Sequence, residues 1–147
     1  MLFSQFSAED AWLVSVDQYQ DSLQFYASDA VYDLTTYQLE VSGVSEILMD
    51  PVTIEPDSST ITVLPNGKIE RLHNAYFWVD SQTQTDYDFY NAELDIQNAG
   101  SFTGSADFDY IDLEGVVQVI HFLSLQKKGD VVTGYAYISE EDDFHLD

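Results

Sequence analysis

Two segments of this sequence repeat the same alternation of acidic and aromatic residues. They read DYDFYNAE at 86–93 and DFDYIDLE at 107–114. An alternation of period two is typical of an extended strand, because successive side chains of a strand point to opposite faces. We therefore expect both segments to be β-strands, with the aspartates on one face and the aromatic rings on the other.

The alternation changes phase at the same place in both segments. In the first, Tyr87 and Phe89 have one parity and Leu94 has the other. In the second, the aromatic pair is followed by Ile111 and Leu113 in the opposite parity. A β-bulge in each strand would return all these apolar side chains to one buried face. Gly100, Gly104 and small polar residues join the two segments, which predicts a long hairpin.

The solvent face of this hairpin is the candidate partner-binding site. The stretch from 80 to 114 contains no Lys or Arg, so its acids have no basic neighbour in the sequence. The predicted binding residues are all carboxylates: Asp80, Asp86, Asp88, Glu93, Asp95, Asp107, Asp109, Asp112 and Glu114.

The whole chain shares this imbalance of charge. It carries 27 acidic residues against 4 Lys and Arg, a formal net charge of −23 over 147 residues. Self-repulsion on this scale disfavours the compact state, so the charge calls for an explanation. Three remain open: a basic partner surface, bound cations, or adaptation to high salt, where screening is strong.

A face of carboxylates is suited to a basic groove that normally holds nucleic acid. Direct nucleic-acid binding is disfavoured, because Lys and Arg that neutralise phosphates supply most of that affinity. Same-face residues repeat about every 6.6 Å along a strand, and strands lie about 4.8 Å apart. The expected charge density is therefore of the order of that of duplex DNA, which carries one charge per about 3.4 Å of rise on each strand.

In charge and size the chain resembles acidic nucleic-acid mimics such as the phage inhibitors of restriction, uracil-DNA glycosylase or CRISPR effectors. The resemblance implies a non-enzymatic inhibitor or regulator. Its partner would be a basic nucleic-acid-binding protein or a nucleoprotein complex. An immunity protein against a basic nuclease toxin would use the same physics and is a further alternative, and a solvated acidic surface without a dedicated partner is the competing interpretation.

The rest of the chain predicts an α+β fold in a single domain over residues 1–147. Residues 7–26 combine an N-cap candidate with apolar residues at spacings of three and four, which predicts a helical segment. About seven or eight strands follow, with Asn66-Gly67 as the strongest hairpin signal and 75–79 as a central strand. We expect the N-terminal helical segment to pack on a curved, mainly antiparallel sheet, with a loose acidic tail at about 140–147. The predicted helical stripe is Trp12, Val16, Tyr19, Leu23 and Tyr26.

The string FYASDAVYDL at 25–34 resembles the first strand of the ketosteroid-isomerase and scytalone-dehydratase superfamily. The resemblance implies a cone-shaped domain that binds or converts a small molecule in an apolar pocket, which is the alternative function. Tyr19, Tyr26 and Asp33 are its candidate polar groups, against a purely structural role for each. Leu34 and Thr35 stand where isomerases of that superfamily carry their base.

Other catalytic chemistry has little support in the sequence. Without Cys or a Gly-x-Ser-x-Gly motif there is no candidate nucleophile. His73, His121 and His145 lack a metal-binding spacing, and we expect His121 to be a packed or hydrogen-bonded strand residue. The acidic run at 107–114 fails as an EF-hand loop, because Ile111 and Asp112 occupy its fifth and sixth positions. We predict no catalytic residue, no metal and no cofactor.

The sequence also suggests where the protein acts. No run of 18 apolar residues occurs, and the first residues lack the basic region of a secretory signal. The lack of Cys fits a reducing compartment. We therefore expect a cytoplasmic protein without a membrane partner. The strand between Pro51 and Pro56 is expected at a sheet edge or with proline at its first position, and an edge strand would be compatible with a homodimer.

Overall fold

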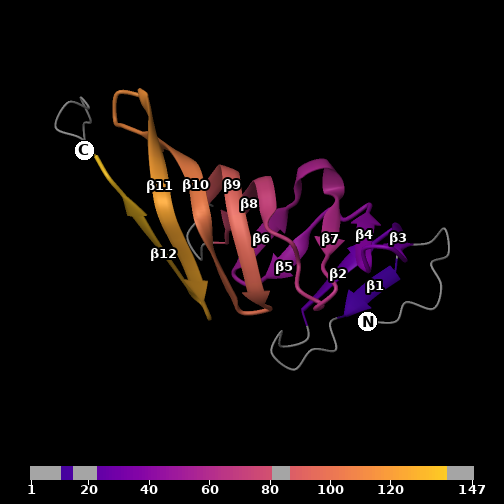
Figure 1. The fold of residues 1–147 in the computed structure, drawn as a ribbon. Coiled ribbons are helices and arrows are strands. Elements are labelled where there is room, and N and C mark those ends of the chain that lie inside the picture. Colours follow the sequence, from indigo (N-terminus) through magenta and orange to yellow (C-terminus); the bar gives the residue numbers. More distant parts are fainter. Residues whose placement is uncertain (1–10, 15–22, 81–86, 139–147) are drawn as a thin grey trace.

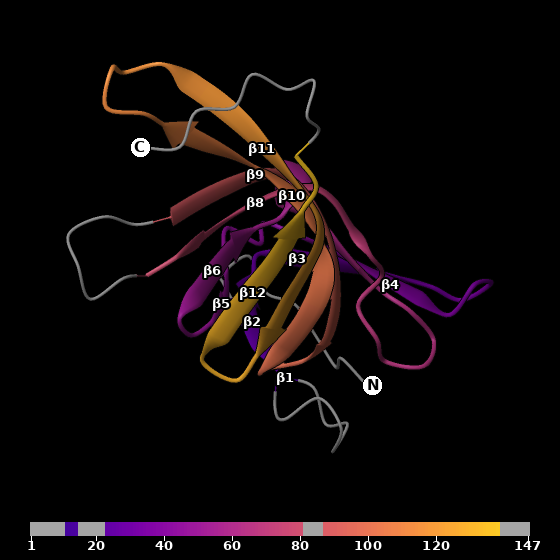
Figure 2. The same ribbon diagram turned by 90° about the vertical axis from the view of Figure 1, so that its left-hand side faces the viewer.

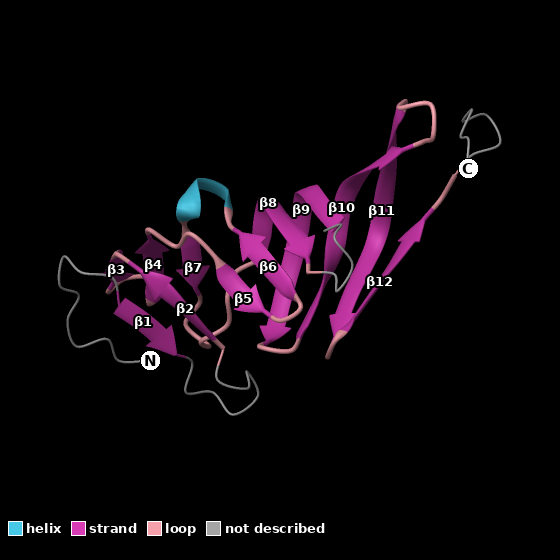
Figure 3. Cartoon of the chain, turned by 180° about the vertical axis from the view of Figure 1, so that it is seen from behind, coloured by secondary structure: helices cyan, strands magenta, loops and turns pink. Residues whose placement is uncertain are grey.

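The computed structural model describes residues 11–14, 23–80 and 87–138. Within these ranges the chain consists of strands and loops, with a single short 3-10 turn, η2 (Asp57–Ser59), and no α-helix (Figure 3). The predicted α+β class is therefore wrong, and the described fold is all-β. The strands are β1 (Ala11–Val14), β2 (Gln24–Ala27), β3 (Asp29–Asp33), β4 (Gln38–Ser42), β5 (Ile47–Met49), β6 (Val52–Glu55), β7 (Ile61–Val63), β8 (Leu72–Val79), β9 (Tyr87–Asn98), β10 (Ser101–Ile111), β11 (Val117–Lys128) and β12 (Val131–Ala136).

Seven of these strands form one antiparallel sheet, in the order β12-β11-β10-β9-β8-β6-β5. This sheet curls into half a barrel. Two smaller sheets, β1-β2 and β3-β4-β7, lie beyond its β5 end (Figure 1). The expected single sheet of seven or eight antiparallel strands is therefore replaced by three sheets, which share the twelve described strands.

Within the helical segment predicted for residues 7–26, the described residues 11–14 and 24–26 are strands. β1 and β2 pair antiparallel, with Trp12 opposite Tyr26 and their ring centroids 3.5 Å apart. Val16 and Tyr19 of the predicted stripe lie outside the described residues.

The error at residues 23–27 is one of period. Leu23, Phe25 and Ala27 are buried, and the residues between them are exposed. The helical stripe joined Leu23 to Tyr26 and left out Phe25, which is almost fully buried. A period of two accounts for all three buried residues, and pairing with β1 supplies the backbone hydrogen bonds that a helix would otherwise have made.

The string at 25–34 spans two strands of different sheets, β2 and β3. Asp33 then holds the turn after β3, because its carboxylate accepts hydrogen bonds from the backbone N–H and the hydroxyl of Thr35. These hydrogen bonds lower the pKa of Asp33. Asp33 is therefore an exposed turn residue, and the described ranges contain no α-helix.

Three stacked phenylalanines form the centre of the core. Phe77 of β8 stacks on Phe89 of β9 with ring centroids 4.6 Å apart, and it meets Phe102 of β10 edge-on at 5.6 Å. Phe77 and Phe102 are fully buried, and buried apolar side chains of all three sheets form one continuous cluster with them. The rings therefore anchor β8, β9 and β10, and β8 is a central strand, as predicted for 75–79.

The strand flanked by prolines is not the sheet edge. β6 lies between β5 and β8, with Val52 opposite Val79. Pro51 precedes the strand in the turn from β5, so it removes no ladder hydrogen bond. The edge of the large sheet on this side is β5.

The Asn66-Gly67 turn forms as predicted. Gly67 has a φ of +81°, and its N–H donates to the carbonyl of Leu64 at 2.8 Å. The strand expected after this turn does not form in full. Its pairing with β7 is limited to an isolated bridge between Ile69 and Val63.

The long acidic hairpin forms from β9 and β10. In β9 the buried parity changes between Phe89 and Ala92. The pairing register between β9 and β10 shifts at the same point. Ser105 pairs with Glu93, but Asp107, two residues later, pairs with Tyr90, so β9 has one extra residue there. The bulge predicted in β9 is therefore confirmed.

The bulge predicted in β10 is wrong. Phe102, Ala106 and Phe108 keep one inward parity along the strand. At the expected place, Tyr110 and Ile111 pair regularly with consecutive residues of β11. The strand simply ends at Ile111, so the parity of the residues beyond it belongs to a turn. Gly104 also lies within β10 rather than in the connection, which is at residues 99–100.

Candidate partner-binding face

The outer face of the β9–β10 hairpin carries four carboxylates in a single row. Asp95 and Glu93 of β9 lie opposite Thr103 and Ser105 of β10. Thr103 and Ser105 point outward, and Asp107 and Asp109 continue the same outward face of β10. Because paired residues share a face and positions two apart repeat on it, the carboxylates follow one another along the hairpin. We call this row the acidic file; its members are, in order, Asp95, Glu93, Asp107 and Asp109.

Basic side chains of β8 and the preceding loop meet one end of the acidic file. Arg71 lies 3.6 Å from the carboxylates of both Glu93 and Asp95. The Nδ1 atom of His73 also contacts Glu93. These side chains are partly exposed, and such surface pairs contribute about 0–1 kcal/mol each. Their main consequence is electrostatic, since the charge of Arg71 partly neutralises this end of the file.

Asp107 occupies the middle of the file and is the most hydrogen-bonded of its members. The Nδ1 atom of His121 lies 2.7 Å from Oδ1 of Asp107, and Nδ2 of Asn91 donates to Oδ2 at 3.0 Å. Partial burial is the largest single influence on the pKa of Asp107 and raises it, but the two hydrogen bonds and the charge of His121 together lower it below its usual value. The prediction of a hydrogen-bonded strand role for His121 is confirmed.

At the other end of the acidic file, near Asp109, the carboxylates lie beside tyrosines instead of basic side chains. The hydroxyl of Tyr90 donates to Oδ1 of Asp109 at 2.6 Å, and this hydrogen bond, with burial and the neighbouring negative charge, raises the pKa of Tyr90 to about 12. Burial and a hydrogen bond to Asp88 likewise raise the pKa of Tyr76 to about 12.

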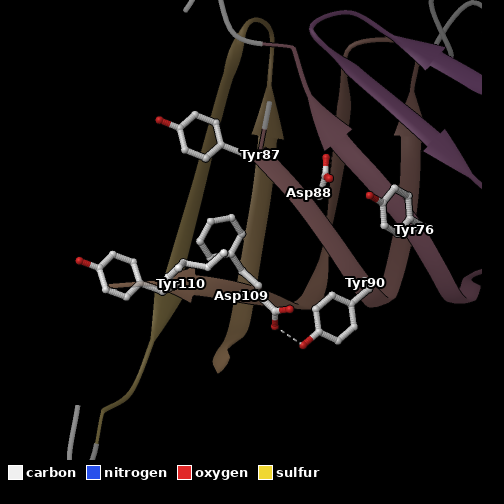
Figure 4. Close-up of a pocket in the computed structure, with 8 residues that line it drawn as sticks. Tyr76, Tyr87, Asp88, Tyr90, Asp109 and Tyr110 are labelled. Carbon is white, nitrogen blue, oxygen red and sulfur yellow. Dashed lines mark hydrogen bonds between the residues drawn. The ribbon is translucent and has the colours of Figure 1, made fainter. Parts of the chain in front are cut away.

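These tyrosine–aspartate pairs border a cleft where β9 and β10 separate. Pairing between the two strands reaches Phe89 opposite Phe108 and stops. Beyond this point β9 runs beside β8, and β10 runs beside β11, so that the two pairs of strands diverge (Figure 2). The β9–β10 cleft has a volume of about 540 Å³ and is lined by Tyr76, Tyr87, Asp88, Tyr90, Phe108, Asp109, Tyr110 and Ile111 (Figure 4).

Two of the predicted residues lie in the turn between β10 and β11. The carboxylate of Asp112 accepts hydrogen bonds from the backbone N–H groups of Glu114 at 2.9 Å and Val116 at 2.8 Å. Asp112 therefore holds the turn, while Glu114 is exposed beside it.

Of the last two predicted residues, Asp80 is not part of the acidic file. Asp80 follows β8, where it is exposed and its N–H donates to the carbonyl of Pro51 at 2.8 Å. Asp86 lies outside the described residues, as does the predicted tail at 140–147.

The prediction missed the partners of the acidic file and the cleft. Arg71 and His73 stand on either side of Leu72, two positions apart. The period of two that predicted the acidic strands therefore also predicts that Arg71 and His73 share a face. Tyr76 and Tyr90 were readable as aromatic strand residues but not as partners of aspartates, because that depends on the cross-strand register.

Neither a metal centre nor a membrane span is formed by the described part of the chain. In residues 11–14, 23–80 and 87–138, no three His, Asp or Glu side chains are placed to hold one ion. Over the same ranges, no helix has the length and apolar character needed to cross a bilayer.

No protein-family model matches this chain, and no curated protein or solved structure is significantly similar to it. Its function must therefore be inferred from the acidic file and the β9–β10 cleft themselves.

Proposed function

We propose that the protein is a non-enzymatic inhibitor or regulator that occupies the basic nucleic-acid-binding surface of a partner protein or nucleoprotein complex. The observation that carries this proposal is the acidic file, an ordered row of carboxylates on a rigid hairpin. Its members are spaced by about 6.6 Å along the strands. One strand of duplex DNA carries a charge per about 3.4 Å of rise, so the file supplies about half that linear density before its neighbours are added.

The charge along the file is uneven, which gives it a direction. The charge of Arg71 partly offsets the negative charge at the end formed by Asp95 and Glu93. The other end has Asp88, Asp112 and Glu114 nearby and no Lys or Arg in the sequence between 80 and 114. A basic partner would therefore be drawn first to the end at Asp109.

Attraction of this kind depends on ionic strength. It accelerates encounter at low salt and weakens as the Debye length shortens from about 10 Å at 0.1 M to about 3 Å at 1 M. We place the interaction in the cytoplasm, where a chain without Cys needs no oxidising environment.

The proposal is tested by capturing a partner from a bacterial lysate on the immobilised protein at low and at high salt. We expect a basic nucleic-acid-binding protein to be retained at low salt, released as salt rises, and displaced by added duplex DNA. Retention that DNA does not compete would contradict the proposal, because the two ligands would then occupy different surfaces.

A charge-neutralised variant separates the file from the overall charge. The test variant is Glu93→Gln, Asp95→Asn, Asp107→Asn and Asp109→Asn combined. The matched control removes the same four charges from exposed residues around β3, β4 and η2, through Asp29→Asn, Glu40→Gln, Glu46→Gln and Asp57→Asn. We expect the test variant to lose at least tenfold in affinity for the captured partner, and the control to lose less than threefold. Equal losses would show that only net charge matters.

A further inference from the structure

We propose that the β9–β10 cleft holds the guanidinium group of an arginine side chain from the partner. This inference rests on the proposed function for the source of the arginine. The chemistry of the cleft is independent of that source, so the two can be tested apart.

Aromatic rings form most of the cleft wall. Tyr87 and Phe108 face one another across the separation of β9 and β10, with ring centroids 6.3 Å apart and planes inclined by 40°. Tyr76, Tyr90 and Tyr110 complete the aromatic lining (Figure 4). The faces of such rings carry the negative part of the ring quadrupole and attract cations.

Two carboxylates stand among these rings, one on each of the diverging strands. Asp88 belongs to β9 and Asp109 to β10; Asp109 accepts a hydrogen bond from the hydroxyl of Tyr90, and Asp88 lies beside Tyr76, whose pKa its charge helps to raise. An ionised carboxylate offers about four acceptor sites, so each retains capacity for a further donor. No basic residue is among those that line the cleft.

A guanidinium group fits this lining better than other ligand chemistries do. Its plane stacks on aromatic faces, and its five N–H donors can reach carboxylates on two sides. An ammonium group is a more strongly hydrated point charge and cannot stack. An anion would be repelled by both aspartates. The volume of about 540 Å³ has room for the guanidinium and its aliphatic stem, since sites for small ligands span about 300–1,000 Å³.

The first test uses the wild-type protein with three small probes. N-acetyl-arginine methylamide, its citrulline analogue and its lysine analogue are titrated at low salt, and two-dimensional amide NMR spectra are recorded. We expect the arginine compound to shift the signals of residues 87–90 and 108–111 and to saturate in the millimolar range, as for a fragment of this size. The citrulline analogue, which has nearly the same shape but no charge, should cause no saturable shift, and the lysine analogue should bind several-fold more weakly.

Two outcomes would overturn the inference. Equal binding of the citrulline analogue would remove the role of charge. Shifts spread over the whole acidic surface, without saturation at the cleft, would show only general attraction of cations.

Variants of one exposed ring test the stacking directly. Tyr87→Leu should weaken arginine binding at least fivefold, whereas Tyr87→Phe should retain it because the ring face remains. Tyr87 is 48% exposed, so neither change is expected to disturb folding, and Tyr135→Leu on β12 is the matched control. Equal weakening by Tyr87→Leu and Tyr135→Leu would contradict a site at the cleft.

The two proposals fail in different ways. If partner capture depends on the acidic file but the arginine compound does not bind the cleft, only the present inference is lost. If the arginine compound binds while the four-charge variant captures the partner as well as the wild type does, the proposed function is lost and the cleft site stands.

Discussion

The two ends of the large sheet differ in how fully their side chains are covered. In β6, Val52, Thr53 and Ile54 are all buried, so both faces of the strand are packed. In β12, none of the six residues is buried, and Tyr135 is 82% exposed. We call the part from β5 to β9 the covered end and the part formed by β11 and β12 the open end.

This difference shows that apolar composition does not by itself place a strand in the core. β11 has the same length as β9 and as many apolar residues. Nevertheless, only Leu125 and Lys127 of β11 are buried. The buried amine of Lys127 donates hydrogen bonds to the carbonyls of Gly100 and Gly129. These two bonds link the turn between β9 and β10 to the turn between β11 and β12. The free energy of folding is therefore concentrated at the covered end, while the open end is held mainly by backbone pairing.

The strongest test of this comparison removes a core ring. Phe77→Ala is expected to lower the free energy of unfolding by about 3–5 kcal/mol, because it leaves a cavity between the rings of β9 and β10. Tyr135→Ala at the open end should change it by less than about 0.5 kcal/mol. Urea unfolding followed by circular dichroism measures both, and similar losses for the two variants would abolish the distinction between the ends.

The second prediction concerns the junction of the two ends at β10. A Cβ atom added at Gly104 would lie 1.8 Å from the carbonyl oxygen of Glu93, so the β9 and β10 backbones would have to move apart. We expect Gly104→Ala to cost about 1–3 kcal/mol, as overpacking does. Gly100→Ala is the control, since its Cβ would meet only the Asn98 side chain at 3.5 Å. A cost for Gly100→Ala as large as that for Gly104→Ala would mean that backbone proximity is not the cause.

The smallest predicted effect concerns Asp107 and depends on pH. Its pKa is lower in the folded protein than in the unfolded chain, so its contribution to stability is complete above the unfolded value of about 3.9 and is lost as the pH falls through the folded value. Asp107→Asn should therefore cost about 0.5–1.5 kcal/mol near pH 7, the usual worth of a hydrogen bond.

The difference between Asp107→Asn and the wild type should shrink toward zero as the pH is lowered below about 3.9. Measuring the difference cancels the general relief of repulsion that protonation brings to so acidic a chain. Thermal unfolding at a series of pH values provides it, and a difference that stays constant down to pH 2 would argue against a stabilising role for the charged form.

The parts of this structure that could be predicted are those that depend on local alternation. The acidic–aromatic period identified β9, β10 and the bulge near Asn91, because each side chain reports its own face. The same rule was available for Phe25 and its neighbours, but the spacing of Trp12, Leu23 and Tyr26 satisfied a helical period as well. Local periodicity cannot decide between two templates that share residues.

The carboxylates of the candidate site could be predicted from the sequence, but their partners and the cleft could not, for a different reason. Which carboxylates line up depends on cross-strand register, and the register shifts at Asn91, whose φ of +50° marks the bulge. Arg71 and His121 reach the acidic file only through that register. The cleft depends on β9 leaving β10 to run beside β8, a choice of partner that no short segment of sequence encodes.

The separation of β9 and β10 beyond Phe89 and Phe108 also bears on how this protein can change over generations. The core rings of Phe77, Phe89 and Phe102 lie at and below the point of divergence, whereas Tyr87, Asp88, Tyr110 and Ile111 of the β9–β10 cleft lie above it. We expect substitutions above that point to reshape the cleft at little cost to folding, and substitutions of the core rings to destabilise the fold. Under the proposed function, such a division would let a lineage follow a target that is itself changing while its scaffold stays the same.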